Sequence, residues 1–197
     1  MISEPEFKTR LLEKLNVINP GWADGDLDNS REKKADIVNN SLQIAIEIKD
    51  DTLYKALVPM PGRMIGQTND LKQKNRQFKD DLKSANKKFI NYPSYKTILI
   101  LRTDMADRTT GLIDYIINGL KTFKKDGNEL VYVGRPNTYF SDEDNSISEV
   151  GAIIFWGNNQ IVYGPNNNPN FNKARFLDKD DIENILDITM VGLDVDI

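Results

Sequence analysis

The sequence predicts an α/β fold in which a mixed β-sheet is flanked by α-helices. Two observations carry this prediction. Segments with apolar residues at helical spacing alternate along the chain with apolar or alternating segments of strand length. No internal repeat and no linker-like stretch divides the 197 residues, so we expect one domain that spans residues 1–197.

The first expected helix covers residues 4–16. Ser3 followed by Glu6 has the form of a capping box, in which each side chain satisfies a free backbone N–H group of the first turn. Apolar residues then recur at helical spacing: Phe7, Leu11, Leu12 and Leu15. Pro20 and a polar stretch over residues 24–30 end this helix.

A β-hairpin is expected next, with strands over residues 34–38 and 42–49 and a turn over residues 39–41. Side chains alternate between the two faces of a strand. In the second strand the isoleucines therefore share one face, while Glu47 and Lys49 share the other. The two charged side chains point the same way.

The rest of the chain alternates in the same manner. A long polar helix over residues 66–89 has a thin apolar stripe, and residues 97–101 are typical of a central strand. The remaining expected elements are a helix over 109–123, strands over 129–134, 151–156 and 160–163, and a last helix over 179–187 capped by Asp178. This order of elements favours a mixed sheet with helices on its faces.

Composition excludes several classes of chemistry. The chain has no cysteine and no histidine, which excludes disulfides, thiolate zinc sites and imidazole chemistry. Catalysis has to use carboxylates, lysine, hydroxyl groups or a metal ion held by oxygen. The sequence shows neither a signal-like start nor an apolar run of membrane-spanning length, so we expect a cytoplasmic protein with no membrane partner.

The net charge of -4 is unevenly distributed along the chain. Residues 62–90 contain eight basic and three acidic residues, whereas residues 137–197 contain eleven acidic and three basic ones. A polyanion can approach the basic segment while the acidic end stays away from it. A solvated helix face explains the basic segment equally well.

Charged residues converge where the two strands of the expected hairpin meet. Asp36 lies on one strand, and Glu47 and Lys49 follow on the other. Two carboxylates with the backbone carbonyl of Ile48 between them make an all-oxygen pocket of the kind that Mg²⁺ occupies. A metal ion there can activate water and stabilise charge on a phosphate, while Lys49 orients the nucleophile or neutralises the same charge.

The strings Lys34-Ala35-Asp36 and Ala45-Ile46-Glu47-Ile48-Lys49 resemble the PD-(D/E)xK motif of restriction-endonuclease-like nucleases. The resemblance covers about the first half of the chain, and Ala35 stands where the family pattern most often has proline. It implies a restriction-endonuclease-like fold and a Mg²⁺ or Mn²⁺ cofactor, with Asp36, Glu47 and Lys49 as catalytic residues. It also implies a supporting glutamate on the first helix, for which Glu6 is the best match and Glu13 the second.

Some relatives also carry a glutamine on the helix that follows the lysine. Gln67 or Gln73 can hold that place, and we favour Gln67 because it lies near the helix start, beside Arg63. The expected phosphate contacts are Arg63, Gln67, Lys72, Lys74 and Arg76.

The resemblance implies a metal-dependent nuclease that cleaves DNA, with RNA as an alternative and restriction or defence as the leading role. A homodimer is expected, since cutting two strands calls for two sites. Two other hypotheses stay open. The chain can be a catalytically inactive nuclease-like module that binds nucleic acid or a protein partner. It can also be an ordinary α/β domain in which Glu47 and Lys49 form a surface pair worth under about 1 kcal/mol.

Overall fold

The structure is a computed structural model that describes residues 2–27, 32–50, 67–102, 122–127, 129–134, 147–157, 160–164 and 171–192. Side chains of α2 are described from Phe78 onward. The helices are α1 (Glu4–Ile18), α2 (Gln67–Phe89) and α4 (Lys179–Leu186), with 3₁₀ turns η1 (Gly25–Leu27) and η5 (Lys173–Arg175). The strands are β1 (Trp22–Asp24), β2 (Ile37–Asn39), β3 (Ile44–Asp50), β4 (Lys96–Arg102), β5 (Thr122–Asp126), β6 (Glu129–Gly134), β7 (Ala152–Trp156), β8 (Gln160–Tyr163) and β9 (Met190–Gly192).

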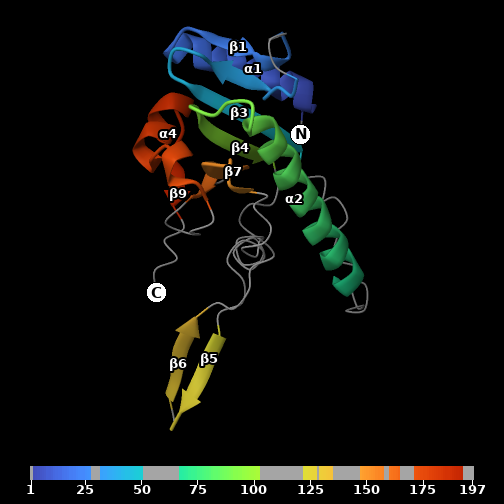
Figure 1. Cartoon of the computed structure of the whole chain (residues 1–197), viewed down its shortest axis with the longest axis vertical. Helices are drawn as coiled ribbons and strands as arrows, with labels where there is room; N and C mark the ends of the chain where they lie inside the picture. The colour runs from blue at the N-terminus through green and yellow to red at the C-terminus, as the bar shows by residue number, and fades with distance from the viewer. Residues whose placement is uncertain are drawn as a thin grey trace.

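Seven of these strands form one mixed sheet in the order β1-β2-β3-β4-β7-β8-β9, shown in Figure 1. β1, β2 and β3 are antiparallel neighbours, whereas β4 runs parallel to both β3 and β7. β8 is antiparallel to β7 and parallel to β9. β5 and β6 form a separate two-stranded sheet. The predicted α/β class with a mixed sheet and flanking helices is confirmed.

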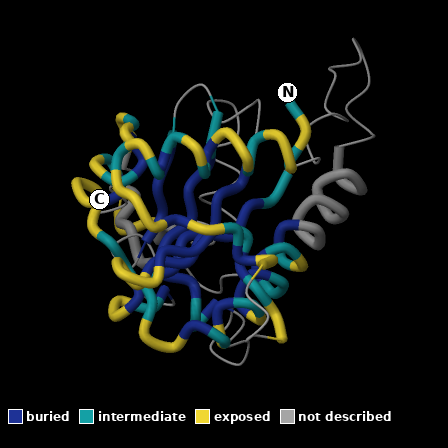
Figure 2. Tube along the Cα trace, turned by 90° about the horizontal axis from the view of Figure 1, so that it is seen from above, coloured by how far each residue is buried: buried dark blue, intermediate teal, exposed yellow. Residues whose placement is uncertain are grey.

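Helices cover both faces of the large sheet, and two apolar clusters result. On one face the described stripe of α2 (Phe78, Leu82, Ala85 and Phe89) packs on β3, β4 and β7. On the other face α1 and α4 pack on the same strands through Leu11, Leu15, Ile182 and Leu186. Figure 2 shows the consequence, with buried strands at the centre and exposed residues around them. The sheet is therefore buried on both faces, as parallel central strands require.

β3 has the predicted alternation of side chains. Ile44, Ile46 and Ile48 belong to the cluster under α1 and α4, whereas Ala45 belongs to the cluster under α2. Glu47 lies on the same face as Ala45, since residues two apart share a face. The acidic side chain therefore lies beneath α2.

Two predicted helix starts are confirmed by their caps. The Ser3 hydroxyl accepts a hydrogen bond from the Glu6 N–H at 3.4 Å, and the Asp178 carboxylate accepts one from the Asp181 N–H at 2.8 Å. Both side chains satisfy N–H groups that have no partner within the first helical turn.

Several predicted boundaries were wrong. β2 begins at Ile37, so residues 34–36 are not strand. The helix predicted over 109–123 fails at its end, because Thr122 begins β5, and residues 109–121 lie outside the described part of the chain. β1 and β9 were missed, since three residues are too few for a pattern and each strand forms by pairing with a neighbour. None of the described helices is long and apolar enough to cross a membrane.

Candidate active site

Asp36 lies immediately before β2, where the chain enters the sheet. Its backbone carbonyl accepts a hydrogen bond from the Gly25 N–H at 3.0 Å, which ties η1 to this point. A Cβ atom on Gly25 would lie 1.9 Å from the Ala35 carbonyl oxygen, so only glycine fits. The side-chain atom Oδ2 accepts a hydrogen bond from the Ile48 N–H at 2.7 Å. These contacts hold Asp36 against β3.

Glu47 is the central residue of the site, and its side chain has no exposed surface. The Lys49 ammonium lies 2.8 Å from Oε1 of Glu47. The Lys88 ammonium, from the last turn of α2, lies 2.7 Å from Oε1 and 2.8 Å from Oε2. It is also 3.5 Å from Oδ1 of Asp36. Two carboxylates and two ammonium groups therefore converge beneath α2.

The pKa of the buried Glu47 carboxyl is far from its ordinary value. Its pKa is raised to about 7: burial is the largest cause, the negative charge of Asp36 adds to the rise, and Lys88 and Lys49 oppose both effects. Two ammonium groups approach Oε1, so this buried carboxylate oxygen is held by two ion pairs.

Two further groups near the site, Lys49 and Asp81, also have shifted pKa values. Burial acts to lower the pKa of Lys49, but the carboxylates of Glu47, Asp36 and Glu4 outweigh it, so the pKa is raised. Burial raises the pKa of Asp81 on α2 to about 6, with Lys49 opposing and Asp80 and Glu4 adding to the rise. Such clusters of mutually perturbed groups are typical of functional sites.

The structure does not bring Glu6, the glutamate predicted from the resemblance, to these carboxylates. Glu6 is exposed, and its carboxylate pairs with Arg10 one turn along α1 at 2.7 Å. Glu4 is half-buried and influences the pKa values of both Lys49 and Asp81. Of the glutamates in the first turn of α1, Glu4 is the one whose charge reaches the site.

The site offers three oxygen donors of the type that binds a hard divalent cation. The Ile48 N–H donates to Asp36, and the N–H and C=O of one strand residue point to the same side, so the Ile48 carbonyl faces Asp36. Asp36, Glu47 and this carbonyl are the three oxygen donors of the predicted site. Within the described residues no group of three or more Asp or Glu side chains is gathered closely enough to hold a metal ion. A cation bound by two carboxylates that keeps several waters is the coordination that Mg²⁺ tolerates.

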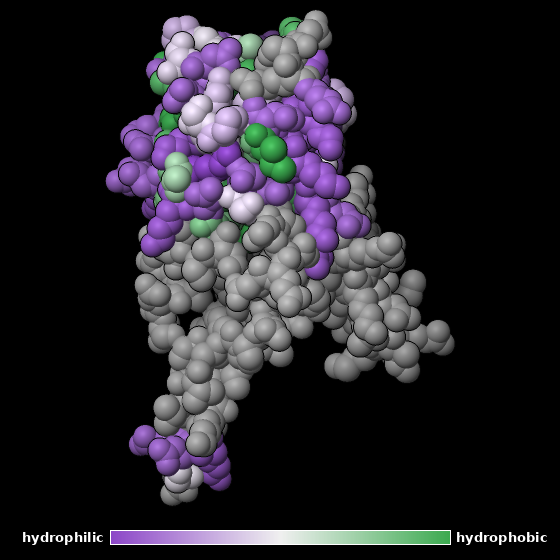
Figure 3. Space-filling model, in the orientation of Figure 1, coloured by the Kyte–Doolittle hydropathy of each residue, from purple (hydrophilic) through white to green (hydrophobic). Residues whose placement is uncertain are grey.

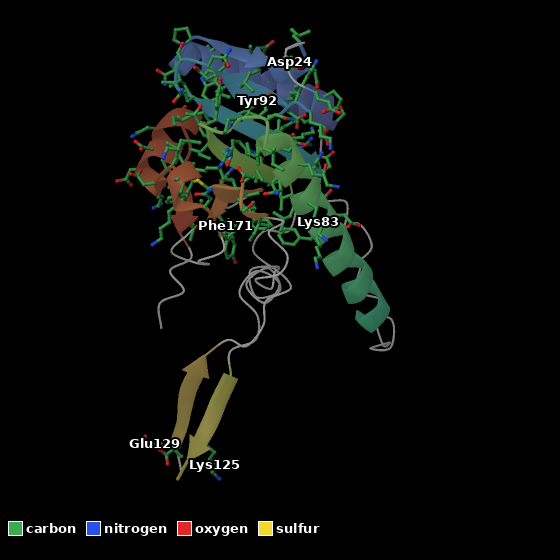
Figure 4. All side chains as sticks on the ribbon, viewed as in Figure 1. Asp24, Lys83, Tyr92, Lys125, Glu129 and Phe171 are labelled. Atoms are coloured by element: carbon green, nitrogen blue, oxygen red, sulfur yellow. The ribbon has the colours of Figure 1, made fainter. Side chains whose placement is uncertain are left out.

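A basic pocket of about 390 Å³ adjoins the carboxylate pair. Four lysines line it: Lys33, Lys34, Lys87 and Lys88. Asp26, Glu32 and Ser84 complete the lining. Figure 4 labels Lys83 and Tyr92, which bracket the end of α2 that carries Lys87 and Lys88. In Figure 3 hydrophilic residues dominate the described surface of this view.

The predicted phosphate contacts lie outside the side chains that the structure describes. Arg63 lies outside the described residues, and Gln67, Gln73, Lys72, Lys74 and Arg76 lie on α2 with side chains outside the description. Gln67 is the first residue of α2 as the structure describes it, within the helix predicted over residues 66–89.

Sequence reasoning missed Lys88 and Asp81. Both lie on the edge of the buried stripe of α2, seven residues apart, with Ser84 between them. This spacing places all three on one helical face, and α2 runs opposite to β3, so Asp81 approaches Lys49 while Lys88 reaches Glu47. The signal was present as polar residues at helical spacing beside apolar ones.

The chain matches no protein-family model, no curated protein and no solved structure. Its function has to be argued from the site itself.

Proposed function

We propose that this protein is a metal-dependent phosphodiesterase that cleaves nucleic acid, with DNA as substrate and restriction or defence as its role. The observation that supports this most is the convergence of Asp36, Lys49 and Lys88 on the fully buried Glu47. A buried carboxylate beside a second carboxylate is costly to maintain for stability alone. Its position matches the PD-(D/E)xK string that the sequence resembles.

Each group of the site has a separate role in the proposed reaction. Asp36, Glu47 and the Ile48 carbonyl would hold Mg²⁺ or Mn²⁺, which supplies an acidified water and neutralises charge on a phosphate. Lys49, held 2.8 Å from Glu47, is placed to orient the attacking water or to stabilise the phosphate charge. Burial of Glu47 excludes bulk water from one side of the site, which strengthens each of these electrostatic contacts.

The test is cleavage of supercoiled plasmid and of 5′-labelled single-stranded DNA with Mg²⁺, Mn²⁺ or EDTA. The variants Asp36→Asn and Lys49→Met should lower the rate at least about 100-fold, because each removes a group that acts on the reacting phosphate. Arg10→Met serves as the matched control, since it removes an exposed cation on α1. Full activity of Asp36→Asn, or cleavage in EDTA, would contradict the proposal.

One observation favours a second candidate, the nuclease-like module that binds nucleic acid without cleaving it. The Lys88 ammonium already neutralises part of the carboxylate charge that a metal ion would use. A wild-type chain that retains DNA in a filter-binding assay but leaves it intact with either metal supports this candidate over the enzyme.

A further inference from the structure

We infer that Lys88 is a displaceable internal cation, which a divalent metal ion drives from the carboxylate pair into the adjoining basic pocket, where it binds a phosphate group. The inference rests on the metal site of the proposed function and adds a linkage between metal and phosphate binding. Its ligand is the phosphate monoester or diester of a nucleotide.

The ammonium group of Lys88 contacts the same carboxylates that a metal ion would bind. Its ammonium lies 2.7 and 2.8 Å from the two oxygens of Glu47 and 3.5 Å from Oδ1 of Asp36. It therefore lies against both carboxylates that the metal ion would use. An ammonium group and a divalent cation cannot share this position, because two positive charges a few ångströms apart repel strongly in a buried site.

Charge balance shows why Lys88 is the group that leaves. The metal-free site holds two carboxylates and two ammonium groups, and a divalent cation adds two positive charges to an already balanced site. Lys49 lies on β3 beside Glu47, whereas Lys88 extends from a helix end and lines the pocket as well. A lysine side chain is a flexible four-carbon stem, so its ammonium can move without the helix moving.

The pocket next to Lys88 has the chemistry of a phosphate site. Lys33, Lys34 and Lys87 line its walls with Lys88. One of its two acidic groups, Asp26, is paired with Lys8 at 2.7 Å, which offsets its charge. The volume of about 390 Å³ accommodates a nucleotide phosphate with its sugar. Ser84 adds a hydroxyl donor that suits a phosphate oxygen.

The consequence is positive linkage between the two ligands. A metal ion frees Lys88 for the phosphate, and a phosphate stabilises the position of Lys88 that leaves the carboxylates open. Linkage of this kind is reciprocal, so each ligand raises the affinity of the other by the same factor. A coupling of five-fold or more is within the usual range.

The test is calorimetric titration of the full chain with Mn²⁺ and with thymidine 5′-monophosphate, alone and together, at pH 8. In the wild type we expect Mn²⁺ to raise nucleotide affinity about five-fold or more. Lys88→Met should bind Mn²⁺ about five-fold tighter than the wild type and should lose most of the linkage. Lys87→Met, which lines the same pocket, should weaken nucleotide binding and leave Mn²⁺ affinity unchanged.

Each outcome decides the inference. Independent binding of the two ligands to the wild type would overturn it, and this result does not depend on any variant folding. Mn²⁺ affinity in folded Lys88→Met equal to or below that of the wild type would also overturn it, as would a wild type that binds no Mn²⁺. Linkage without DNA cleavage would contradict the nuclease proposal alone, whereas cleavage without linkage would contradict this inference alone.

Discussion

Two ionic clusters lie near the C-terminal end of α2, and they are built differently. In the first, Arg175 pairs with Glu149 and donates to the Tyr92 carbonyl at 2.7 Å, just beyond the C-terminus of α2. In the second, Glu47 and Asp36 meet Lys49 and Lys88, the last of which lies in the final turn of α2. Both clusters contain buried charge, and Lys88 of the second also lines the basic pocket.

In the Arg175 cluster each charge is used for structure. The guanidinium also reaches the Phe89 carbonyl at 3.5 Å, where a cation complements the negative end of the helix. Backbone atoms of Glu149 bond Asn86 and Thr97, which ties α2, β4 and the start of β7 together. The donors and acceptors match one another, which is typical of a buried cluster that fixes a fold.

The Glu47 cluster differs in its electrostatics. Glu47 is fully buried beside the carboxylate of Asp36, and its pKa is raised to about 7, with burial as the largest cause. The comparison teaches that burial alone does not identify a functional charge. A buried carboxylate with a raised pKa, beside accessible space, is the informative feature.

Breaking the structural cluster has the largest expected effect. Arg175→Met should lower the free energy of unfolding by about 3 kcal/mol, because it leaves the half-buried carboxylate of Glu149 without its cation and removes one of the donors to the Phe89 and Tyr92 carbonyls. Urea denaturation measures the loss. A change under about 1 kcal/mol would show that this cluster is not structural.

The pH dependence of stability sharpens the comparison. Because the pKa of folded Glu47 lies near 7 and above its ordinary 4.5, the folded chain keeps a proton there that the unfolded chain has released. The contribution of this group is present below pH 4.5 and is lost as the pH rises through 7. It amounts to at most about 3 kcal/mol.

Glu47→Gln should remove this pH dependence of the free energy of unfolding. The measurement is the difference in unfolding free energy between wild type and variant from pH 4 to pH 8, which cancels the titration of the other groups. Asp81→Asn is the control. Because the raised pKa of Asp81 is about 6, its contribution to the free energy of unfolding changes at lower pH than that of Glu47. A difference between wild type and Glu47→Gln that stays constant with pH would contradict the raised pKa.

A smaller effect tests the departure from the family pattern at Ala35. The buried Ala35 N–H donates to the Tyr92 hydroxyl at 3.2 Å, a bond that a proline at this position could not make. Tyr92→Phe should cost about 1–2 kcal/mol in urea unfolding, because it leaves this N–H unsatisfied. Ala35→Pro should lower the free energy of unfolding less in the Tyr92→Phe background than in the wild type. An equal loss in both backgrounds would show that the hydrogen bond to Tyr92 does not explain why alanine, and not proline, stands at position 35.

The smallest expected effect concerns Glu6. Glu6 forms an exposed ion pair with Arg10, one turn further along α1, and such pairs contribute about 0.3–0.5 kcal/mol to the free energy of unfolding. Glu6→Gln should therefore leave both stability and Mn²⁺ affinity nearly unchanged, in calorimetry beside the wild type. A ten-fold loss of Mn²⁺ affinity would restore Glu6 as a metal ligand.

Local pattern was sufficient for much of the fold. The alternation in β3, the caps Ser3 and Asp178 and the β7–β8 hairpin depend on residues close in sequence, so they could be predicted. Three-residue strands such as β1 depend on pairing across the sheet, which no local window contains.

The same distinction holds for the candidate site. Glu47 and Lys49 were placed on one face of β3 because strand periodicity alone decides it. Lys88 comes from a helix 41 residues away in sequence from Glu47, and its approach depends on how α2 packs on β3. Glu4 rather than Glu6 reaches the site because the orientation of α1 on the sheet decides which residue of its first turn points there.

The most direct test of the account is the stoichiometry of Mn²⁺ binding to the wild type and to Asp36→Asn. Asp36 lies at the site's edge with a side chain 13% exposed, so its amide variant should fold. The account predicts one Mn²⁺ per wild-type chain and a loss of affinity of at least ten-fold in Asp36→Asn. Equal affinity in the two proteins would contradict the claim that Asp36 and Glu47 form a metal centre.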